Sequence, residues 1–202
     1  MYNLKIYDSL KSKKVYFAPI DRKNIRVYAC GPTVYDYAHI GNARMAVVFD
    51  TLIRLLKKQY SKVTYVSNIT DIDDKIIERS ILEKIPIKNI TDKYTKIYNE
   101  DMKMLNVLLP DYQPRATEYV KEMIKSIKVL IKKNYAYIAE KHVLFNVSSF
   151  PKYGTLSRRN REQQIAGSRV KIAKYKKNSG DFVLWKPSKE NEPSWESPWG
   201  MG

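Results

Sequence analysis

Residues 27–50 read VYACGPTVYDYAHIGNARMAVVFD, and this stretch decides the fold that the sequence predicts. It contains the only cysteine of the chain, Cys30, and one of the two histidines, His39. A β-branched and aromatic run over 25–29 leads into a Cys-Gly-Pro turn, and a strongly apolar run over 43–58 follows the polar loop. A strand, a glycine turn, a polar loop and a helix start, in this order, are typical of the place where an α/β protein binds a nucleotide.

The flanking sequence extends this pattern. Residues 62–68 alternate as a second strand, so the order strand, helix, strand predicts a right-handed parallel βαβ unit. The helix between the strands is apolar on nearly every side, which predicts that it is covered on more than one face. The sequence also predicts a short strand over 4–7 and a hairpin over 135–147. It predicts one helix that ends near residue 84 and two further helices that are capped by Thr91 and Thr117. A break in regular structure is expected over 110–114 and a mostly irregular basic stretch over 156–177.

The charge of the chain favours a polyanionic partner. The formal net charge is +16, and residues 121–180 hold 15 Lys and Arg against 3 Glu, a net of +12. Lys and Arg gain free energy when they displace the counterions of RNA, so RNA is the favoured partner. The alternative is a compositional bias, because Lys, Ile, Asn and Tyr are abundant throughout the chain.

Other bulk features exclude two classes of protein. No apolar run approaches the roughly 20 residues of a membrane span, and the N-terminal residues lack the apolar region of a secretory signal. A single cysteine cannot form an intrachain disulfide. We therefore expect a cytoplasmic protein with no membrane attachment.

Several short motifs together resemble one family. Residues 28–44 resemble the nucleotide-binding signature of class I aminoacyl-tRNA synthetases, and more narrowly that of the cysteinyl-tRNA synthetase family. The same family is indicated by residues 68–76 (NITDIDDKI), 115–117 (RAT), 153–157 (YGTLS) and 181–186 (DFVLWK).

This resemblance implies a fold and a domain organisation. The fold is an α/β, doubly wound, Rossmann-like parallel sheet. Residues 1–115 are expected to form the first half of the catalytic nucleotide-binding domain, residues 116–190 an α+β connective insertion, and residues 191–202 the start of the second half. The chain is then expected to be part of a longer protein.

The segment His39-Ile-Gly41-Asn42 resembles the family's His-Ile-Gly-His motif, with Asn42 in the last position. Negative charge builds on the α-phosphate of ATP when a carboxylate attacks it, and a helix N-terminus offers free N–H groups and positive potential there. The resemblance implies catalytic roles for His39 and Asn42, and ATP binding by both residues, by Gly41 and by Gly31. Taken alone, His39 is more typical of a hydrogen-bonded histidine in a turn.

Cys30 is the second residue to which the resemblance gives a role. It implies that Cys30 binds a zinc ion that also holds the substrate thiolate, because zinc prefers thiolate to the hydroxyl of serine. A lone cysteine after a strand is otherwise more typical of a small buried residue. Thr33 and Thr70 are expected to bind the cysteine substrate, and Tyr35 and Asp36 to shape its pocket. The remaining zinc ligands are expected beyond residue 202.

Three other features have simpler interpretations. We expect Asp71, Asp73 and Asp74 to cap and charge the N-terminus of the next helix rather than to bind a metal. His142 is assigned to structure. The segment over 186–189 (KPSK) resembles the family's Lys-Met-Ser-Lys loop only superficially, because its proline stiffens a loop that must move.

The function implied by the resemblance is two-step ligation of cysteine to tRNA(Cys), with ATP and Mg²⁺ in the first step and Zn²⁺ as cofactor, by a monomeric enzyme that serves protein biosynthesis. The 202-residue chain alone is expected to be inactive. Two alternatives stay open. One is a related ligase that passes cysteine to an amino sugar, and the other is an inactive RNA-binding fragment.

Overall fold

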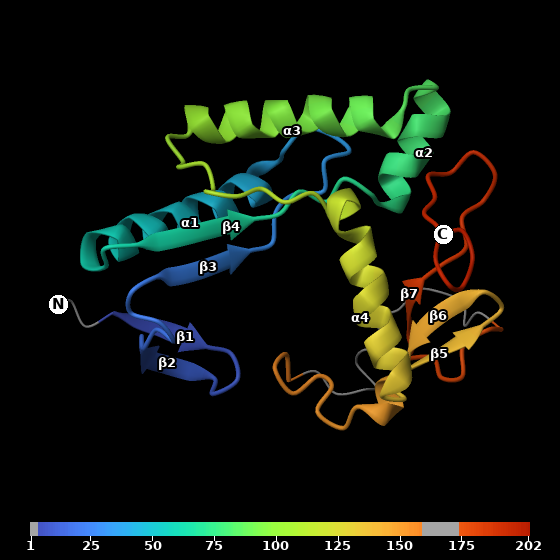
Figure 1. The fold of residues 1–202 in the computed structure, drawn as a ribbon. Helices are drawn as coiled ribbons and strands as arrows, with labels where there is room; N and C mark the ends of the chain where they lie inside the picture. Colours follow the sequence, from blue (N-terminus) through green and yellow to red (C-terminus); the bar gives the residue numbers. More distant parts are fainter. Residues whose placement is uncertain (1–3, 159–173) are drawn as a thin grey trace. The chain divides into compact units, whose positions relative to one another are not determined.

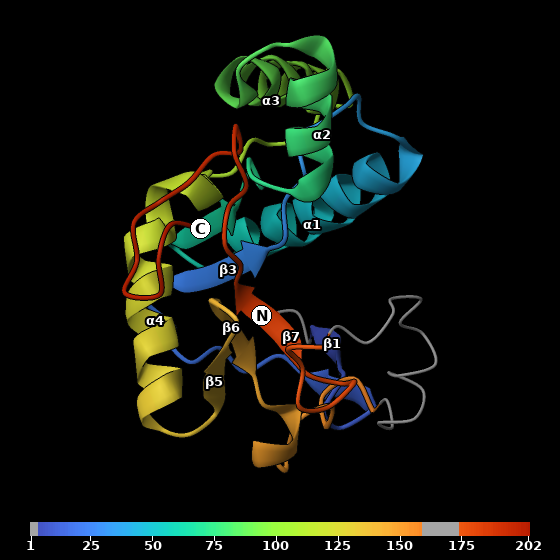
Figure 2. The same ribbon diagram turned by 90° about the vertical axis from the view of Figure 1, so that its right-hand side faces the viewer.

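The computed structural model describes residues 4–158 and 174–202, which divide into two compact units. Unit 1 comprises Phe17–Tyr119 with the N-terminal Leu4, and unit 2 comprises Lys5–Tyr16 and Val120–Gly202. Figures 1 and 2 show the elements of both units. Within the described ranges, no helix is long and apolar enough to cross a membrane.

Unit 1 is built on the predicted parallel βαβ arrangement. Strands β3 (Ile25–Ala29) and β4 (Val63–Ser67) pair in parallel, with Ile25 opposite Val63, and helix α1 (Ile40–Gln59) connects them (Figure 1). The parallel unit predicted from the sequence is therefore confirmed. The core between the sheet and α1 consists of buried apolar side chains, namely Ile25, Ala29, Ile53, Leu56, Val63 and Tyr65.

Helix α1 contacts two neighbours, as its apolar composition predicted. Its residues Ile53 and Leu56 pack on the sheet, whereas Ala46 packs on helix α3. Val47 and Val48 are exposed in this structure. One buried residue of α1 is polar: Asp50 accepts hydrogen bonds from the Arg54 side chain and from a backbone N–H of the chain that follows α3.

The segment over 110–114, predicted as a break in regular structure, contributes to the sheet. It runs parallel to β4 on the side away from β3, with isolated bridges between Val66 and Tyr112 and between Ile69 and Arg115. Asp111 strengthens this pairing, because its carboxylate accepts a 2.7 Å bond from the backbone N–H of Tyr65. The prolines removed backbone donors and hid a third parallel neighbour from the sequence pattern.

Two helices connect β4 to that segment. Helix α2 (Asp74–Glu83) begins after Asp73, whose side chain accepts from the Lys75 N–H, so capping by Asp73 is confirmed. Helix α3 (Ile87–Met104) begins after Pro86, and the predicted start at Thr91 is wrong. Thr91 lies a full turn inside the helix and is buried, since the helix already begins directly after Pro86, its N-cap residue.

In the described part of unit 2 there are two antiparallel sheets and one amphipathic α-helix. Strands β1 (Lys5–Asp8) and β2 (Lys13–Tyr16) form a hairpin. Strands β5 (Ala136–Ala139), β6 (His142–Phe145) and β7 (Phe182–Trp185) form the second sheet, which confirms the hairpin predicted over 135–147.

The helix of unit 2 is α4 (Val120–Lys132), which follows a 3-10 helix over Ala116–Tyr119. The capping role predicted for Thr117 is wrong, because both its N–H and its hydroxyl bond to Asp71. The predicted irregular stretch over 156–177 lies largely outside the described residues.

The core of unit 2 lies between α4 and its sheet. Val120 and Ile127 of α4 pack on Ala136, Val143 and Trp185. A buried carboxylate ties the sheet to its loops: Asp181, 1% exposed, accepts bonds from the Tyr137 hydroxyl, the Val147 N–H and the Asn178 N–H. Burial raises the pKa of Tyr137, so this hydroxyl remains a donor at neutral pH.

A close backbone approach just after β3 generates a prediction. A Cβ atom on Gly31 would lie 1.5 Å from the backbone oxygen of Asn68, so only glycine fits there. We expect Gly31→Ala to lower the free energy of unfolding by about 3 kcal/mol, because the strand ends must separate. Chemical denaturation of the purified chain measures this effect.

Gly180→Ala is the matched control. A Cβ at Gly180 meets no atom within 4 Å, and the change is expected to alter stability by less than about 0.5 kcal/mol. Equal unfolding free energies for the two variants would contradict the close approach at Gly31.

Candidate functional site

The candidate site begins where β3 and β4 end. Gly31 donates its N–H to the side-chain oxygen of Asn68, at 2.9 Å, and the Asn68 amide donates to the Thr70 hydroxyl, at 3.1 Å. Beyond the strands, Thr33 and Thr70 form a parallel bridge. The structure thus brings Gly31, Thr33 and Thr70 together at the carboxyl edge of the parallel pair, where open α/β sheets bind ligands.

Asn68 is the residue of this junction to which sequence reasoning gave no role. Its one side chain joins the end of β3 to the chain beyond β4 through a donor and an acceptor. A signal was available: Asn68 directly follows the second strand, and the carboxyl-edge rule applies to it as it does to Thr70.

The loop over 32–38 leads from this junction to α1. Val34 is buried in a small core with Ile69, Ile90 and Tyr94. A cavity of about 170 Å³ lies between the loop, the start of α1 and two tyrosines of α3, Tyr94 and Tyr98. Because both tyrosines are largely buried, the wall of this cavity on the α3 side is aromatic and rigid.

His39 ends the loop and caps α1. Its Nδ1 accepts the backbone N–H of Gly41 at 3.0 Å. A ring nitrogen that accepts carries no proton, so in the neutral imidazole the proton is on Nε2. His39 is exposed, and its Nε2–H is therefore a donor held at the positive end of a helix dipole.

Asn42 and Gly41 complete the helix start. The Asn42 side-chain oxygen accepts the His39 backbone N–H at 3.1 Å, which closes a capping box and leaves the Asn42 amide group as a donor. A Cβ on Gly41 would lie 2.8 Å from Cε1 of His39. A side chain at Gly41 would therefore displace the folded-back imidazole, a consequence that the sequence alone did not show.

Cys30 is exposed, so the alternative of a small buried residue is wrong. Its Sγ lies 3.8 Å from the carbonyl oxygen of Gly31. Within residues 4–158 and 174–202, no three Cys, His, Asp or Glu side chains come together as a metal site. The exposed thiol suits zinc as one soft ligand, whereas tight binding needs at least three protein ligands.

Asp71 was expected to cap a helix and instead organises a loop. It is 3% exposed and accepts from the Thr117 N–H and hydroxyl at 3.0 and 2.6 Å. Arg115 lies 3.8 Å from the same carboxylate and pairs with Asp92 of α3 at 2.7 Å. The capping interpretation of Asp71 is therefore wrong, and the residue connects the segments over 69–71 and 115–117.

The other histidine and the KPSK segment lie in unit 2. His142 begins β6, where its Nδ1 lies 2.9 Å from the carbonyl oxygen of Glu140 and its ring stacks on Tyr175 at 4.0 Å. In the KPSK segment, the Ser188 N–H bonds to the carbonyl of Met201. The contacts of His142 with Glu140 and Tyr175 agree with the structural role that the sequence analysis assigned to it.

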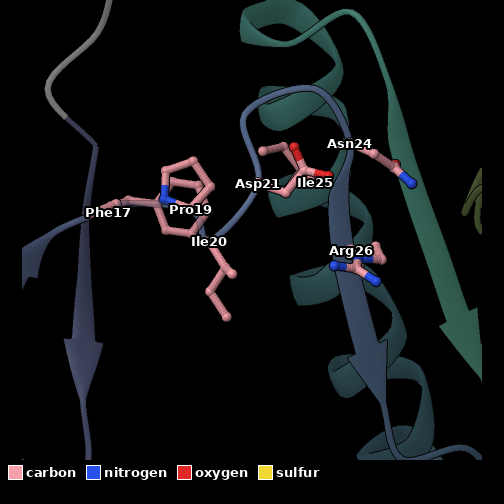
Figure 3. Close-up of a pocket in the computed structure, with 8 residues that line it drawn as sticks. Phe17, Pro19, Ile20, Asp21, Asn24, Ile25 and Arg26 are labelled. Carbon is pink, nitrogen blue, oxygen red and sulfur yellow. The ribbon is translucent and has the colours of Figure 1, made fainter.

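A second cavity, of about 370 Å³, lies at the opposite end of β3 (Figure 3). Its lining includes Phe17, Pro19, Asn24 and Arg26. The Ile20 side chain extends away from β3 in Figure 3 and is fully exposed. Because this cavity adjoins the start of β3, it is separate from the junction that follows the strand's last residue.

Two comparisons with known proteins give matches over nearly the whole chain. The family model described as tRNA synthetases class I (C) catalytic domain matches residues 16–202. Proteins named cysteine–tRNA ligase are 52% identical in Rhodospirillum centenum, over 98% of this chain, and 54% identical in Beijerinckia indica, also over 98%. The chain spans 44% of the length of each of these two relatives.

The match extends through both units and includes the loop between β3 and α1. The strand β3, the capping histidine His39 and the parallel strand β4, which Asn68 and Thr70 follow, are thus part of a chain that is about half identical to these ligases. The chain belongs to the family of class I (C) tRNA synthetase catalytic domains.

Proposed function

We propose that this chain is the cysteine- and ATP-binding part of an enzyme that ligates cysteine to tRNA(Cys). In the first step a carboxylate oxygen of cysteine attacks the α-phosphorus of ATP, which is accompanied by Mg²⁺. The bond between the α- and β-phosphates breaks, and pyrophosphate leaves. In the second step a terminal hydroxyl of the tRNA attacks the carbonyl carbon of the adenylate, and AMP leaves.

The observation that carries this proposal is the geometry of His39. Its Nδ1 is occupied by the Gly41 N–H, so Nε2–H is the atom free to donate. A donor fixed before the reaction is most effective where charge develops, which here is on the oxygens of the α-phosphate. Asn42 offers its amide donor from the next turn, and Gly41 lets the nucleotide approach the backbone.

The junction after β3 is proposed to hold the amino acid. Thr33, Thr70 and Gly31 lie together at that edge, and Cys30 directly precedes them. When bound, a zinc ion would select the thiolate of cysteine over the hydroxyl of serine. Cys30 would be one of its ligands, and the others would come from parts of the protein outside this chain.

We propose the same division of the chain as the sequence predicts. Residues 1–115 would form the first half of a doubly wound catalytic domain, residues 116–190 a connective insertion, and residues 191–202 the beginning of the second half. The parallel pair of β3 and β4, with a third parallel neighbour at 111–115, supports this proposal.

The tRNA is proposed to contact helix α4. Lys121, Lys125, Lys128 and Lys132 recur every three or four residues, so they lie along one side of the helix, and all are exposed. Within the described residues, none of the four is in an ion pair that would neutralise it. Such a row of unpaired cations fits the phosphates of an RNA.

The function is tested with the full-length protein that contains this chain. Wild type is expected to catalyse cysteine-dependent exchange of pyrophosphate into ATP and to transfer labelled cysteine to tRNA. His39→Asn keeps an acceptor for the helix N-cap, but its shorter side chain cannot place a donor where the Nε2–H of His39 lies. The exchange rate should therefore fall about 100-fold or more. His142→Asn, at the other histidine, is the control and should retain the wild-type rate.

Transfer of the label to an amino sugar in place of tRNA would replace this proposal with the alternative ligase. Absence of exchange in the full-length wild type would favour the RNA-binding alternative.

Cys30→Ser tests the metal proposal. We expect zinc content and cysteine activation to fall together, because a serine hydroxyl is a poor ligand for zinc. Zinc is measured by atomic emission on the purified full-length protein, and activation by pyrophosphate exchange. Stoichiometric zinc with wild-type activity in this variant would show that Cys30 is not a ligand.

Charge reversal on α4 tests the RNA surface. Lys125→Glu, Lys128→Glu and Lys132→Glu together should weaken tRNA binding at least about tenfold. The slope of the logarithm of the binding constant against the logarithm of the salt concentration should become less steep by about 2, because fewer counterions are released. The control is the triple variant Lys57→Glu, Lys58→Glu and Lys62→Glu, which changes the charge equally at exposed positions of unit 1. Equal losses in both variants would indicate that only net charge matters.

A further inference from the structure

The loop over 32–38 connects the two halves of the candidate site. Its first part is held by the bridge between Thr33 and Thr70, and its last residue precedes the capping box of His39. The middle of the loop takes part in neither the Thr33–Thr70 bridge nor the capping box. Its conformation nevertheless affects the position of the His39 imidazole relative to the junction. The contacts that hold residues 35–37 therefore influence the geometry of the whole site.

Arg79 of helix α2 supplies the contacts to the loop's main chain and to Asp36, whereas Lys75 of the same helix contacts the Tyr35 side chain, with its ammonium nitrogen 3.5 Å from the hydroxyl. The Arg79 Nη1 donates to the carbonyl oxygen of Tyr35 at 2.7 Å and lies 3.2 Å from the carboxylate of Asp36. Its Nε bonds to Glu83, one turn further along α2, at 2.6 Å. The guanidinium thus uses separate nitrogens to grip the loop and to anchor itself on its own helix.

Helix α3 fixes the opposite side of the guanidinium. The plane of Arg79 lies over the ring of Tyr94, 4.8 Å from its centroid, and Tyr37 packs edge-on against the same ring at 5.4 Å. Tyr94 is buried, so both groups rest on an immobile surface. Arg79 is 26% exposed, which reduces competition from water for its bonds to the loop.

The charge at Asp36 complements this arrangement. Its carboxylate accepts the N–H of Tyr37 at 2.9 Å, and this bond together with Arg79 lowers its pKa. Asp36 is therefore ionised at neutral pH. One nitrogen, Nη1, contacts both the main-chain oxygen and the adjacent carboxylate, while Nε bonds to Glu83. The planar guanidinium thus spans the loop and its own helix at once, which the single nitrogen of an ammonium group cannot do.

We propose that Arg79 is a positioning residue for cysteine activation, which holds residues 35–37 so that the His39 imidazole stays in place at the reacting phosphate. This inference rests on the proposed function. Arg79 acts through the loop and touches no reacting atom. A displacement of about 1 Å at a group that stabilises the transition state can lower a rate about 100-fold, so the anchor of the loop has a kinetic role distinct from stability.

The test uses Arg79→Lys in the full-length protein, with Glu83→Gln as the matched control. The control removes the partner of Arg79 on α2 and leaves its bonds to the loop. Arg79→Lys should lower kcat for pyrophosphate exchange about tenfold or more, with the KM for ATP changed less than about threefold, since the lost interaction belongs to the transition state. Glu83→Gln should keep kcat within about twofold of wild type.

Asp36→Asn removes the negative charge that pairs with Arg79 and keeps a neutral acceptor, at an exposed residue whose replacement leaves the core intact. We expect a kcat about fivefold lower than that of wild type, with an unchanged thermal midpoint. This variant decides the question if Arg79→Lys folds poorly, and a wild-type kcat for Asp36→Asn would then overturn the inference.

A double-mutant cycle separates positioning from stability. If Arg79 acts through His39, adding Arg79→Lys to His39→Asn should lower the rate less than about twofold further. Multiplicative losses, or an Arg79→Lys enzyme as active as Glu83→Gln, would overturn the inference while leaving the proposed function intact. If wild type and Glu83→Gln both lack exchange activity, the proposed function fails and this inference fails with it.

Discussion

The structure of unit 1 depends on the close parallel approach of β3 and β4 at their carboxyl ends. Gly31 lies so near the backbone of Asn68 that no side chain fits between them, and the Asn68 amide group joins Gly31 to Thr70. Parallel strands require a crossover connection, so α1 must begin on the same edge and return along the sheet. This pairing therefore places the start of α1, which His39 caps, at the carboxyl edge of the two strands.

The helix start then determines the state of the imidazole. Because the Gly41 N–H is satisfied by Nδ1 of His39, the other ring nitrogen carries the proton in the neutral ring. A side chain that closes the helix end thus also keeps a ring N–H free, which in the proposed function donates to the phosphate. Asn42 does the same with its amide, whose oxygen caps the His39 backbone. In both side chains one atom caps the helix, Nδ1 of His39 and Oδ1 of Asn42, and a second atom, Nε2 or Nδ2, is the donor in the proposed chemistry.

Much of this arrangement could be predicted from the sequence. The two strands, the helix between them and the hairpin of unit 2 have strong local patterns, and the structure confirms each of them. The helix starts at Thr91 and Thr117 were wrong, because Pro86 begins α3 earlier and Asp71 occupies both donors of Thr117. The third parallel neighbour at 111–115 was missed because its prolines disguise a strand.

The sequence by itself determined the strand and helix periods, the glycine turn and the types of residue near the carboxyl edge, because these depend on neighbours a few positions apart. Only the tertiary structure decided which distant groups meet. It joined Asn68 to Gly31, buried Asp71 against Thr117 and placed Arg79 on the carbonyl of Tyr35. Each of these contacts links segments 37 or more positions apart, where no local period carries information about spatial proximity.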